Sequence, residues 1–180
     1  MKEKKKYKVL FCDLDDTLIE TVTSSIFPQG IWDMKPRFDV WDAIKNSDAE
    51  FIYIVSNQGG IEENYYRNVS IACKIQYVAQ ALEDYINGNK LKKPKDMRWC
   101  DFMYCGFSDP ECGDRKPNTG MLEYFWRRIE NKYDKSECLM IGDARGEKGD
   151  YSNTDRKTAE NFGIDYMDVS KFVEKYGNRK

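Results

Sequence analysis

The sequence predicts an α/β fold with a mostly parallel sheet, because short apolar runs alternate with longer segments of helical periodicity. Each apolar run is followed by turn residues, as in buried parallel strands. The predicted strands are residues 7–12, 51–56, 102–106, 138–142 and, as the weakest pattern, 164–168. The predicted helices are residues 39–46, 62–86, 119–132, 155–162 and 170–176. We expect helices on both faces of the sheet and a single domain over residues 1–180, since the sequence contains no internal repeat.

The composition is that of a globular protein, with 41% hydrophobic and 33% charged residues among 180. No apolar run approaches the roughly 18 residues that a bilayer span requires, and the N-terminal "MKEKKKYK" lacks the apolar region of a secretory signal. We therefore expect a cytoplasmic protein with no membrane contact, and no protein partner is implied. The net charge of −2 argues against a broad surface that coats nucleic-acid phosphates.

The chain contains no histidine, which excludes Ser-His and Cys-His nucleophile systems, zincin motifs and histidine acid/base catalysis. Its six cysteines come without a secretion signal, so we expect most of them to be reduced thiols. Any chemistry must therefore rest on Asp, Glu, Lys, Cys or a metal ion.

Three carboxylates follow the first predicted strand, in the stretch "VLFCDLDDTLIE". Asp13 and Asp15 can face one crevice while Leu14 points back to the core. An Asp can attack phosphorus to form an aspartyl-phosphate, and a second carboxylate can protonate the leaving oxygen and later activate water. The alternative is a turn with a helix cap, which Asp and Thr both favour. We interpret Asp16 as a turn residue ahead of Thr17.

Two further loops carry groups that suit a phosphate. "IVSNQGG" supplies the Ser56 hydroxyl and the Asn57 amide after the second strand, and "DRKPNTGM" presents Lys116, which can neutralise charge on a transferring phosphoryl group. The alternatives are an ordinary turn and a surface lysine. The carboxyl ends of parallel strands meet at one edge of a sheet, so we expect these groups to converge with Asp13 and Asp15.

A fourth group of carboxylates follows the predicted strand at residues 138–142. Asp143 ends the strand, and Asp150 and Asp155 lie further along "GDARGEKGDYSNTDRK". Oxygen ligands of this kind suit Mg²⁺, which takes one or two carboxylates together with substrate phosphate and water. The sequence leaves open whether Asp150 or Asp155 completes the metal shell.

In this order, "DLDDTL", "SNQGG", "RKPNTGM" and "IGDARGEKGDYSNTD" resemble motifs I to IV of the haloacid dehalogenase (HAD) superfamily of phosphohydrolases. The resemblance implies a Rossmann-like sheet, with Asp13 as nucleophile, Asp15 as general acid/base and Thr17 as support for the first loop. It further implies the ligands: Ser56 and Lys116 for phosphate, and Asp13, the Asp15 carbonyl and Asp143 for Mg²⁺.

Within that superfamily, "SNQGGI", "RKPNTGM" and the stretch 143–164 resemble the phosphatase domain of polynucleotide kinase/3'-phosphatases. The resemblance implies removal of a 3'-phosphate from nucleic-acid ends, a DNA-repair activity. The chain has no "GxxxxGK[ST]" motif, so the kinase half is missing from it. The short intervals between motifs leave no room for a sizeable cap domain, and an uncapped crevice can admit the end of a polymer.

Basic and aromatic residues outside the motifs are candidates for nucleic-acid contact. The stretch "KLKKPKDMR" at 90–98 and the N-terminal lysines are candidates for backbone phosphates, and Trp32, Trp41 and Trp99 for stacking on a base. The alternative is a solvated basic loop with tryptophans that pack in the core.

The alternative enzyme is a small-molecule phosphatase of the histidinol-phosphate or heptose-bisphosphate type. Those enzymes carry a zinc loop before the same "RKP", and here Cys105 and Cys112 match two of its positions. Phe107 stands where the loop's His would be and Asp114 where its last Cys would be, so a structural Zn²⁺ would need another ligand, such as Cys100. A third alternative is a catalytically dead fold that serves as a binding module.

Overall fold

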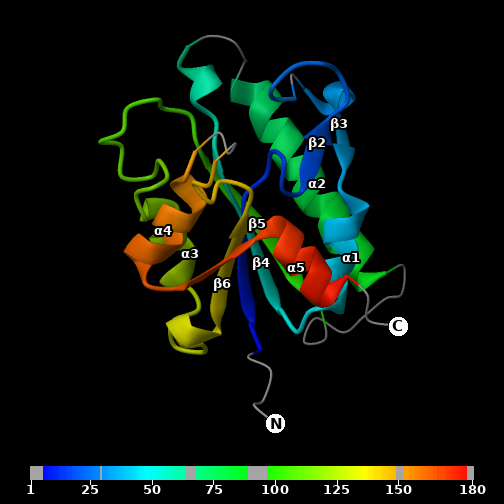
Figure 1. Cartoon of the computed structure of the whole chain (residues 1–180), viewed down its shortest axis with the longest axis vertical. Helices are drawn as coiled ribbons and strands as arrows, with labels where there is room; N and C mark the ends of the chain where they lie inside the picture. The colour runs from blue at the N-terminus through cyan, green and yellow to red at the C-terminus, as the bar shows by residue number, and fades with distance from the viewer. Residues whose placement is uncertain (1–5, 29, 64–67, 89–96, 149–151, 178–180) are drawn as a thin grey trace.

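The computed structural model describes residues 6–28, 30–63, 68–88, 97–148 and 152–177, and Figure 1 shows how its elements are arranged. A five-stranded parallel sheet forms the centre, in the order β5-β4-β1-β6-β7. Its strands are β1 (Val9–Cys12), β4 (Phe51–Asn57), β5 (Trp99–Cys105), β6 (Cys138–Gly142) and β7 (Asp165–Asp168). All five predicted strands and the α/β class are therefore confirmed.

The register of the sheet brings the ends of the three central strands to one edge. Cys12 at the end of β1 lies opposite Ile54 of β4 on one side and opposite Ile141 of β6 on the other. The chain leaves these strands a few residues later, so Asp13, Ser56 and Asp143 emerge beside one another. This is the edge at which ligands bind in open parallel sheets.

Alternate residues of each strand enter two separate hydrophobic clusters. In β1, Leu10 and Cys12 pack on one face, whereas Val9 and Phe11 pack on the other. All four side chains are buried, as expected of a central strand that is covered on both faces. The sheet is thus the middle layer of three.

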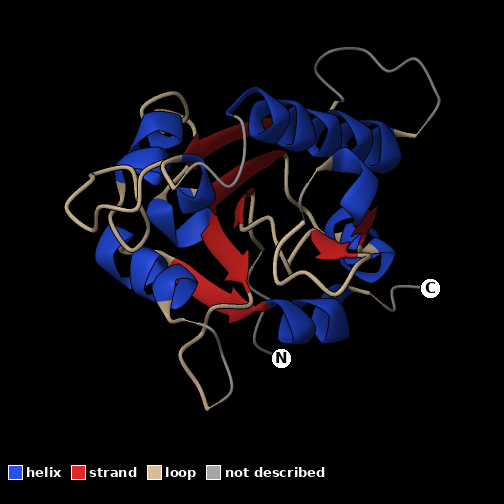
Figure 2. Cartoon of the chain, turned by 90° about the horizontal axis from the view of Figure 1, so that it is seen from above, coloured by secondary structure: helices blue, strands red, loops and turns tan. Residues whose placement is uncertain are grey.

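Helices form the two outer layers, as the view from above in Figure 2 shows. One face is covered by α1 (Phe38–Asn46), α2 (Asn68–Asn87) and α5 (Val169–Tyr176), and the other by α3 (Gly120–Trp126) and α4 (Thr154–Phe162). Short 3₁₀ turns complete the chain: η1 (Ile31–Asp33), η2 (Gly59–Ile61) and η4 (Lys135–Glu137).

Two predicted helices have different bounds in the structure. The helix predicted over 62–86 begins at Asn68, since Gly59–Ile61 form a 3₁₀ turn and residues 64–67 lie outside the described residues. The helix predicted over 119–132 ends at Trp126, where bonds between residues three apart take over, such as Ile129 N to Trp126 O at 2.9 Å. Ile129 is still buried, so the apolar periodicity continues beyond the regular helix.

A small hairpin follows β1 that the sequence pattern did not predict. Its strands β2 (Ile19–Thr21) and β3 (Met34–Pro36) pair antiparallel, with Ile19 opposite Pro36. Three-residue strands are too short to show a period-2 pattern, which explains why the sequence did not reveal them. The connection between them is held by Asp33, whose carboxylate accepts from Thr23 N at 2.9 Å.

The intervals between the motifs hold only small elements within the described residues. The hairpin and α1 fill the first interval, and α2 and β5 fill the second. The expectation of no sizeable cap domain is therefore confirmed for the part of the chain that the structure describes. No helix in those segments is long and apolar enough to cross a bilayer.

Candidate active site

Asp13 and Asp15 lie at the head of the central strand, on a tight turn. The Asp13 N–H still donates to Ile141 O at 3.0 Å, so Asp13 continues the edge of β1. Asp16 has φ 57°, in the left-handed region that Asp tolerates better than most residues. Arg37 supports this turn by donating to Asp16 O at 2.8 Å. The interpretation of Asp16 as a turn residue is confirmed.

Lys116 is a buried lysine that joins two carboxylates. It is only 2% exposed, and its Nζ lies 2.5 Å from Asp13 Oδ1 and 2.7 Å from Asp155 Oδ1. Burial alone would lower the pKa of Lys116, but the charges of Asp13 and Asp155 raise it overall. Lys116 is therefore a fixed positive charge beside Asp13 and not a surface lysine.

Asn57 holds the backbone of that lysine. Its Nδ2 donates to Lys116 O at 2.9 Å, and its Oδ1 accepts from Lys116 N at 2.9 Å. Both ends of the amide are occupied, so these contacts favour a positioning task over the phosphate-binding role that the sequence suggested for Asn57. That role stays an untested prediction.

Asp155 is buried against the end of β6 at the start of α4. Its Oδ2 accepts from Ala144 N at 3.2 Å, while its Oδ1 accepts from Lys116. A Cβ at Gly142 would lie 2.1 Å from Asp155 Oδ2, so the close approach requires glycine there. Asp155 is thus anchored from two sides.

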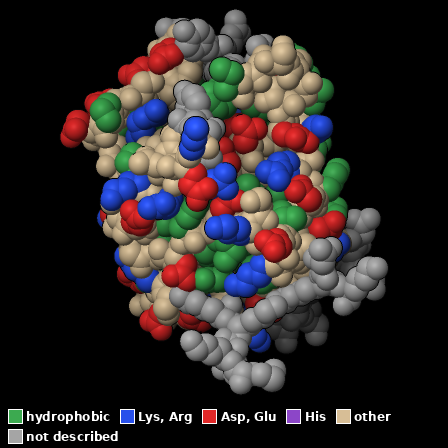
Figure 3. All heavy atoms as spheres, viewed as in Figure 1, with side chains coloured by type: hydrophobic (Ala, Val, Ile, Leu, Met, Phe, Trp, Pro, Cys, Tyr) green, Lys and Arg blue, Asp and Glu red, His purple; other side chains and the backbone are tan. Residues whose placement is uncertain are grey.

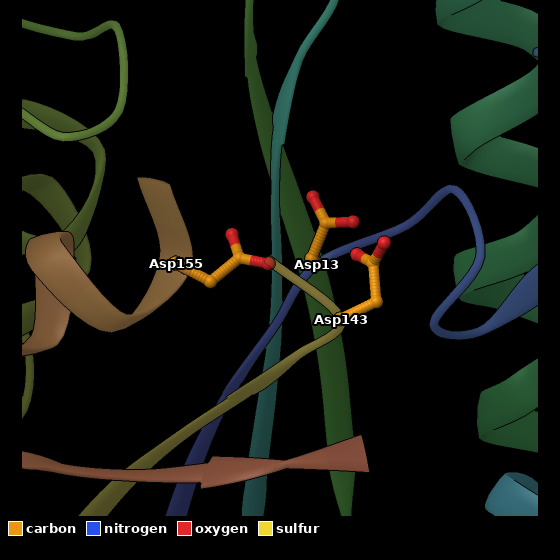
Figure 4. Close-up of side chains that lie close together, drawn as sticks. All are labelled: Asp13, Asp143 and Asp155. Carbon is orange, nitrogen blue, oxygen red and sulfur yellow. The ribbon is translucent and has the colours of Figure 1, made fainter. Parts of the chain in front are cut away.

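Asp13, Asp143 and Asp155 form a cluster of carboxylates, shown in Figure 4, whose ligand atoms all lie within 4.8 Å of one another. Burial is the main cause that raises the pKa of Asp13, and Asp155 and Asp143 add to it while Lys116 opposes it. Burial, followed by the charge of Asp155, raises the pKa of Asp143 to about 6. Such a concentration of negative charge favours a cation. Asp150, the other metal candidate, lies outside the described residues.

Asp15 has a separate set of partners. Gln58 Nε2 donates to Asp15 Oδ2 at 2.7 Å and to the Ser56 hydroxyl at 2.8 Å. Lys74 Nζ donates to Asp15 Oδ1 at 3.2 Å. Sequence reasoning missed Gln58 and Lys74. The available signal was that Lys74 occupies a position of α2 between the buried Ile71 and Val78, where the helical period calls for an apolar residue.

Most of the residues described above line a single cleft of about 420 Å³. Its walls include the predicted site residues Asp13, Asp15, Ser56, Asn57, Lys116, Asp143 and Asp155. Thr17 is fully buried and does not line the cleft, and its hydroxyl has no hydrogen-bond partner within the described segments. Ile26, Phe27 and Pro28, from the β2–β3 connection, form an apolar side that the sequence did not predict. A wider hollow of about 760 Å³ along α3 contains none of the predicted site residues.

Most of the basic and aromatic candidates for nucleic-acid contact either lie away from the cleft or fall outside the described residues. Trp41 is buried and donates its Nε1–H to Leu18 O at 2.9 Å, so it is not available for stacking. Trp99 is the first residue of β5, so it lies at the amino ends of the strands, whereas the cleft lies at their carboxyl ends. Arg98 donates to Ile44 O at 2.8 Å at the end of α1, a structural contact. Most of the basic stretch, residues 89–96, lies outside the described residues, as do N-terminal residues 1–5.

For the zinc alternative, the structure brings two thiols together. Cys105 Sγ and Cys112 Sγ lie 3.6 Å apart. Cys100 is on the same strand as Cys105, five residues away, and at about 3.3 Å per residue it is too distant to join them. Within the described segments, the Asp cluster is the only group of three or more candidate ligands. A Zn²⁺ site at the two thiols is the disfavoured alternative, and nothing in the described residues supplies the further ligands that it needs.

Two solved structures that are described as phosphatases share this architecture. A protein described as a HAD-like phosphatase from Mesorhizobium loti aligns with 97% of this chain and 86% of its own, with a TM-score of 0.63 and 18% identity. The D,D-heptose 1,7-bisphosphate phosphatase of B. bronchiseptica, complexed with magnesium and phosphate, aligns with 93% of this chain and 97% of its own, with a TM-score of 0.60 and 17% identity. At these identities the likeness shows the fold alone, which is the HAD-like fold with the carboxylates and Lys116 at the carboxyl end of β1.

The chain belongs to the polynucleotide kinase 3 phosphatase family, whose model matches residues 8–172. It is 30% identical to the polynucleotide 3'-phosphatase of Saccharomyces cerevisiae, over 86% of this chain and 82% of the relative. It is 29% identical to the bifunctional polynucleotide phosphatase/kinase of Schizosaccharomyces pombe, over 95% of this chain but only 38% of that protein. A histidine biosynthesis bifunctional protein of Campylobacter jejuni is 31% identical over 76% of this chain and 36% of its own length.

Proposed function

We propose that this phosphatase is a Mg²⁺-dependent phosphomonoesterase that removes the 3'-phosphate from nucleic-acid ends through an aspartyl-phosphate on Asp13. The observation that carries the proposal is the arrangement of the two carboxylates. Asp13 is held by Lys116, Asp15 is held by Gln58 and Lys74, and both line the same cleft. The match to the 3'-phosphatase family over residues 8–172 supports the substrate class.

The residues of the cluster fit a magnesium ion. Mg²⁺ takes oxygen ligands, and the carboxylates of Asp13 and Asp143 would hold it, together with the Asp15 carbonyl. Asp155 is less suited, because one oxygen accepts from Lys116 and the other from Ala144. We assign Asp155 the task of orienting Lys116. Bound Mg²⁺ would neutralise negative charge on the phosphoryl group.

The chain's own residues account for both chemical steps. Asp13 attacks phosphorus, and as that O–P bond forms the bond to the leaving oxygen breaks, while Asp15 gives the oxygen a proton. In the second step Asp15 takes a proton from water, whose oxygen attacks phosphorus and releases Asp13. Lys116 stabilises the charge that develops on the phosphoryl oxygens. Ser56 and Lys116 are the proposed phosphate ligands.

The open cleft suits the end of a polymer. Within the described residues the β2–β3 connection and the loops after the central strands line it, and no separate domain covers it, so a substrate would not be enclosed. The face in Figure 3 mixes acidic and basic side chains and shows no broad basic surface. With a net charge of −2, recognition would rest on the terminal nucleotides and not on long-range attraction to the backbone.

The alternative is a small-molecule phosphatase. The specific observation in its favour is that the fold is shared with a heptose bisphosphate phosphatase over nearly the whole of both chains. At 17% identity this likeness shows the fold alone, so the family match gives the nucleic-acid substrate precedence.

The decisive experiment compares kcat/KM for an oligonucleotide with a 3'-phosphate against histidinol phosphate and heptose bisphosphate. The same oligonucleotide with a 5'-phosphate is the matched control. We expect the 3'-phosphate to be preferred over all three, and a preference for either metabolite would overturn the proposed substrate class.

Asp13→Asn should lower kcat by about 10³-fold or more, because the covalent route is lost. Activity of that variant near the wild-type level would overturn the nucleophile.

A further inference from the structure

Lys74 is a fully buried lysine on the inner face of α2. It is 1% exposed and lies among the buried Ile71, Ile75 and Val78 of that helix. An ammonium group in such a place costs stability unless a carboxylate faces it, and an apolar residue would pack there without that cost. A residue that breaks the apolar pattern of a helix is expected where function requires it.

The contacts of Lys74 lead to the proposed proton-transfer residue. Its Nζ lies 3.2 Å from Asp15 Oδ1 and 3.5 Å from Gln58 Oε1. Gln58 in turn donates to Asp15 Oδ2 at 2.7 Å and to Ser56 Oγ at 2.8 Å. Each oxygen of Asp15 therefore has its own donor, and the two donors are joined to each other.

The two carboxylates at the head of β1 are held by different lysines. Lys116 contacts Asp13 and Asp155, and Lys74 contacts Asp15. Asp15 is in a loop beyond the strand, where strand packing does not set its side-chain rotamer. Two donors on its two oxygens fix the plane of that carboxylate.

We infer that Lys74, acting with Gln58, is a positioning residue that aims the Asp15 carboxylate at the leaving oxygen. The inference rests on the proposed function, in which Asp15 transfers the proton. Without Lys74, substrate would still bind and Asp13 would still attack, but the proton would be delivered from a badly placed carboxylate. The loss would then depend on how much the leaving group needs a proton.

The test compares Lys74→Met with wild type on two substrates. Methionine is close to lysine in length and suits the apolar face of α2. A 3'-phosphorylated oligonucleotide has a poor leaving group that needs the proton, whereas 2,4-dinitrophenyl phosphate has one that departs without it. We expect kcat for the oligonucleotide to fall about 10²-fold with KM changed less than twofold. The rate at which dinitrophenol is released in a single turnover should change less than threefold.

The matched control is Ile75→Met, which alters packing on the same face of α2 next to Lys74. We expect it to leave both rates within threefold of wild type. If Lys74→Met does not fold, Gln58→Met reaches the same carboxylate from outside the helix and should show the same split between substrates. Where both variants fold, the double variant should lose little more than Lys74→Met alone, because both residues act on Asp15.

The outcomes separate this inference from the proposed function. If Asp15→Asn shows no split between the two substrates, the proposed function fails. If Asp15→Asn shows the split but Lys74→Met slows both substrates equally, changes KM alone or changes neither rate, the positioning role is overturned. A split in both variants supports it.

Discussion

The close approach between Gly142 and Asp155 links the end of β6 to the cleft. The Asp155 carboxylate lies where a side chain of residue 142 would stand, and from there it holds Lys116. The position of Lys116 beside Asp13 thus depends on the absence of a single carbon atom. Gly142 has no side chain, yet it is part of the site because it leaves room for the Asp155 carboxylate.

We expect Gly142→Ala to lower kcat about 10²-fold, because its Cβ would push Asp155 away and Lys116 with it. The measurement is kcat on an aryl phosphate, with the thermal midpoint Tm as a measure of folding. Gly113→Ala is the control, since a Cβ there meets nothing within 4 Å. An unchanged kcat in Gly142→Ala would contradict the role of Asp155 as the anchor of Lys116.

Among the secondary-structure elements, the amino ends of β1 and β4 and the segment after α3 are tied together by Glu50. Tyr133 donates to its carboxylate at 2.6 Å, and Lys8 and Lys132 each lie 3.1 Å from it. The hydrogen bond from Tyr133, with smaller contributions from the two lysines, lowers the pKa of Glu50 from 4.5 to about 2. These contacts lie at the edge of the sheet opposite the cleft.

A carboxylate whose pKa is lowered on folding stabilises the protein above its unfolded pKa, and this contribution is lost as the pH falls through the folded value. The contribution of Glu50 should therefore be complete above about pH 4.5 and disappear toward pH 2. Because its side chain is 41% exposed, we expect Glu50→Gln to cost only about 1 kcal/mol near neutral pH.

The measurement for Glu50 is the free energy of unfolding in urea at pH 7, 4.5 and 3, compared with wild type and with Glu130→Gln. Glu130 is exposed, so its substitution is the surface control. The difference between Glu50→Gln and wild type should shrink as the pH falls, while activity stays unchanged. A difference that is the same at all three pH values would refute the assignment.

At the scale of the whole molecule, three carboxylates converge from β1, β6 and α4 into one cleft. Folding brings their charges together, and Lys116 compensates only part of them. A cation that binds this cluster in the folded chain alone must shift the folding equilibrium toward the native state.

We expect Mg²⁺ to raise the Tm of wild type by several degrees, since about 2.7 kcal/mol is gained at a hundred times the dissociation constant. Asp143→Asn should lose this shift, because one proposed ligand is gone, and should be no less stable than wild type in chelator. Glu130→Gln should keep the shift. An equal rise in Asp143→Asn and wild type would contradict the proposed ligand set.

The site could be predicted from the sequence where its residues follow strand ends. Asp13, Ser56 and Asp143 leave neighbouring parallel strands, and strand order alone makes them meet. Lys74 could not be assigned in this way, because it is on a helix whose crossing over the sheet decides what its amine touches. The task of Asn57 also depends on contact with a loop far along the chain.

The elements of the fold also divide into those that the sequence pattern predicted and those that it did not. The alternation of apolar runs and helical periods predicted the five strands and the class, since burial on two faces imposes that pattern on any sequence. The hairpin from Ile19 to Pro36 and the end of α3 at Trp126 left no such pattern, because three-residue strands and turns between residues three apart have no distinctive period.

The sequence by itself determined the sheet, the family motifs and the carboxylates that meet at its edge, because these are local patterns along the chain. Only the tertiary structure decided which lysine forms an ion pair with which carboxylate. Lys116 pairs with Asp13 across 103 positions and Lys74 with Asp15 across 59. Charge pairs over such separations are set by how helices and loops pack on the sheet, and no short-range pattern encodes them.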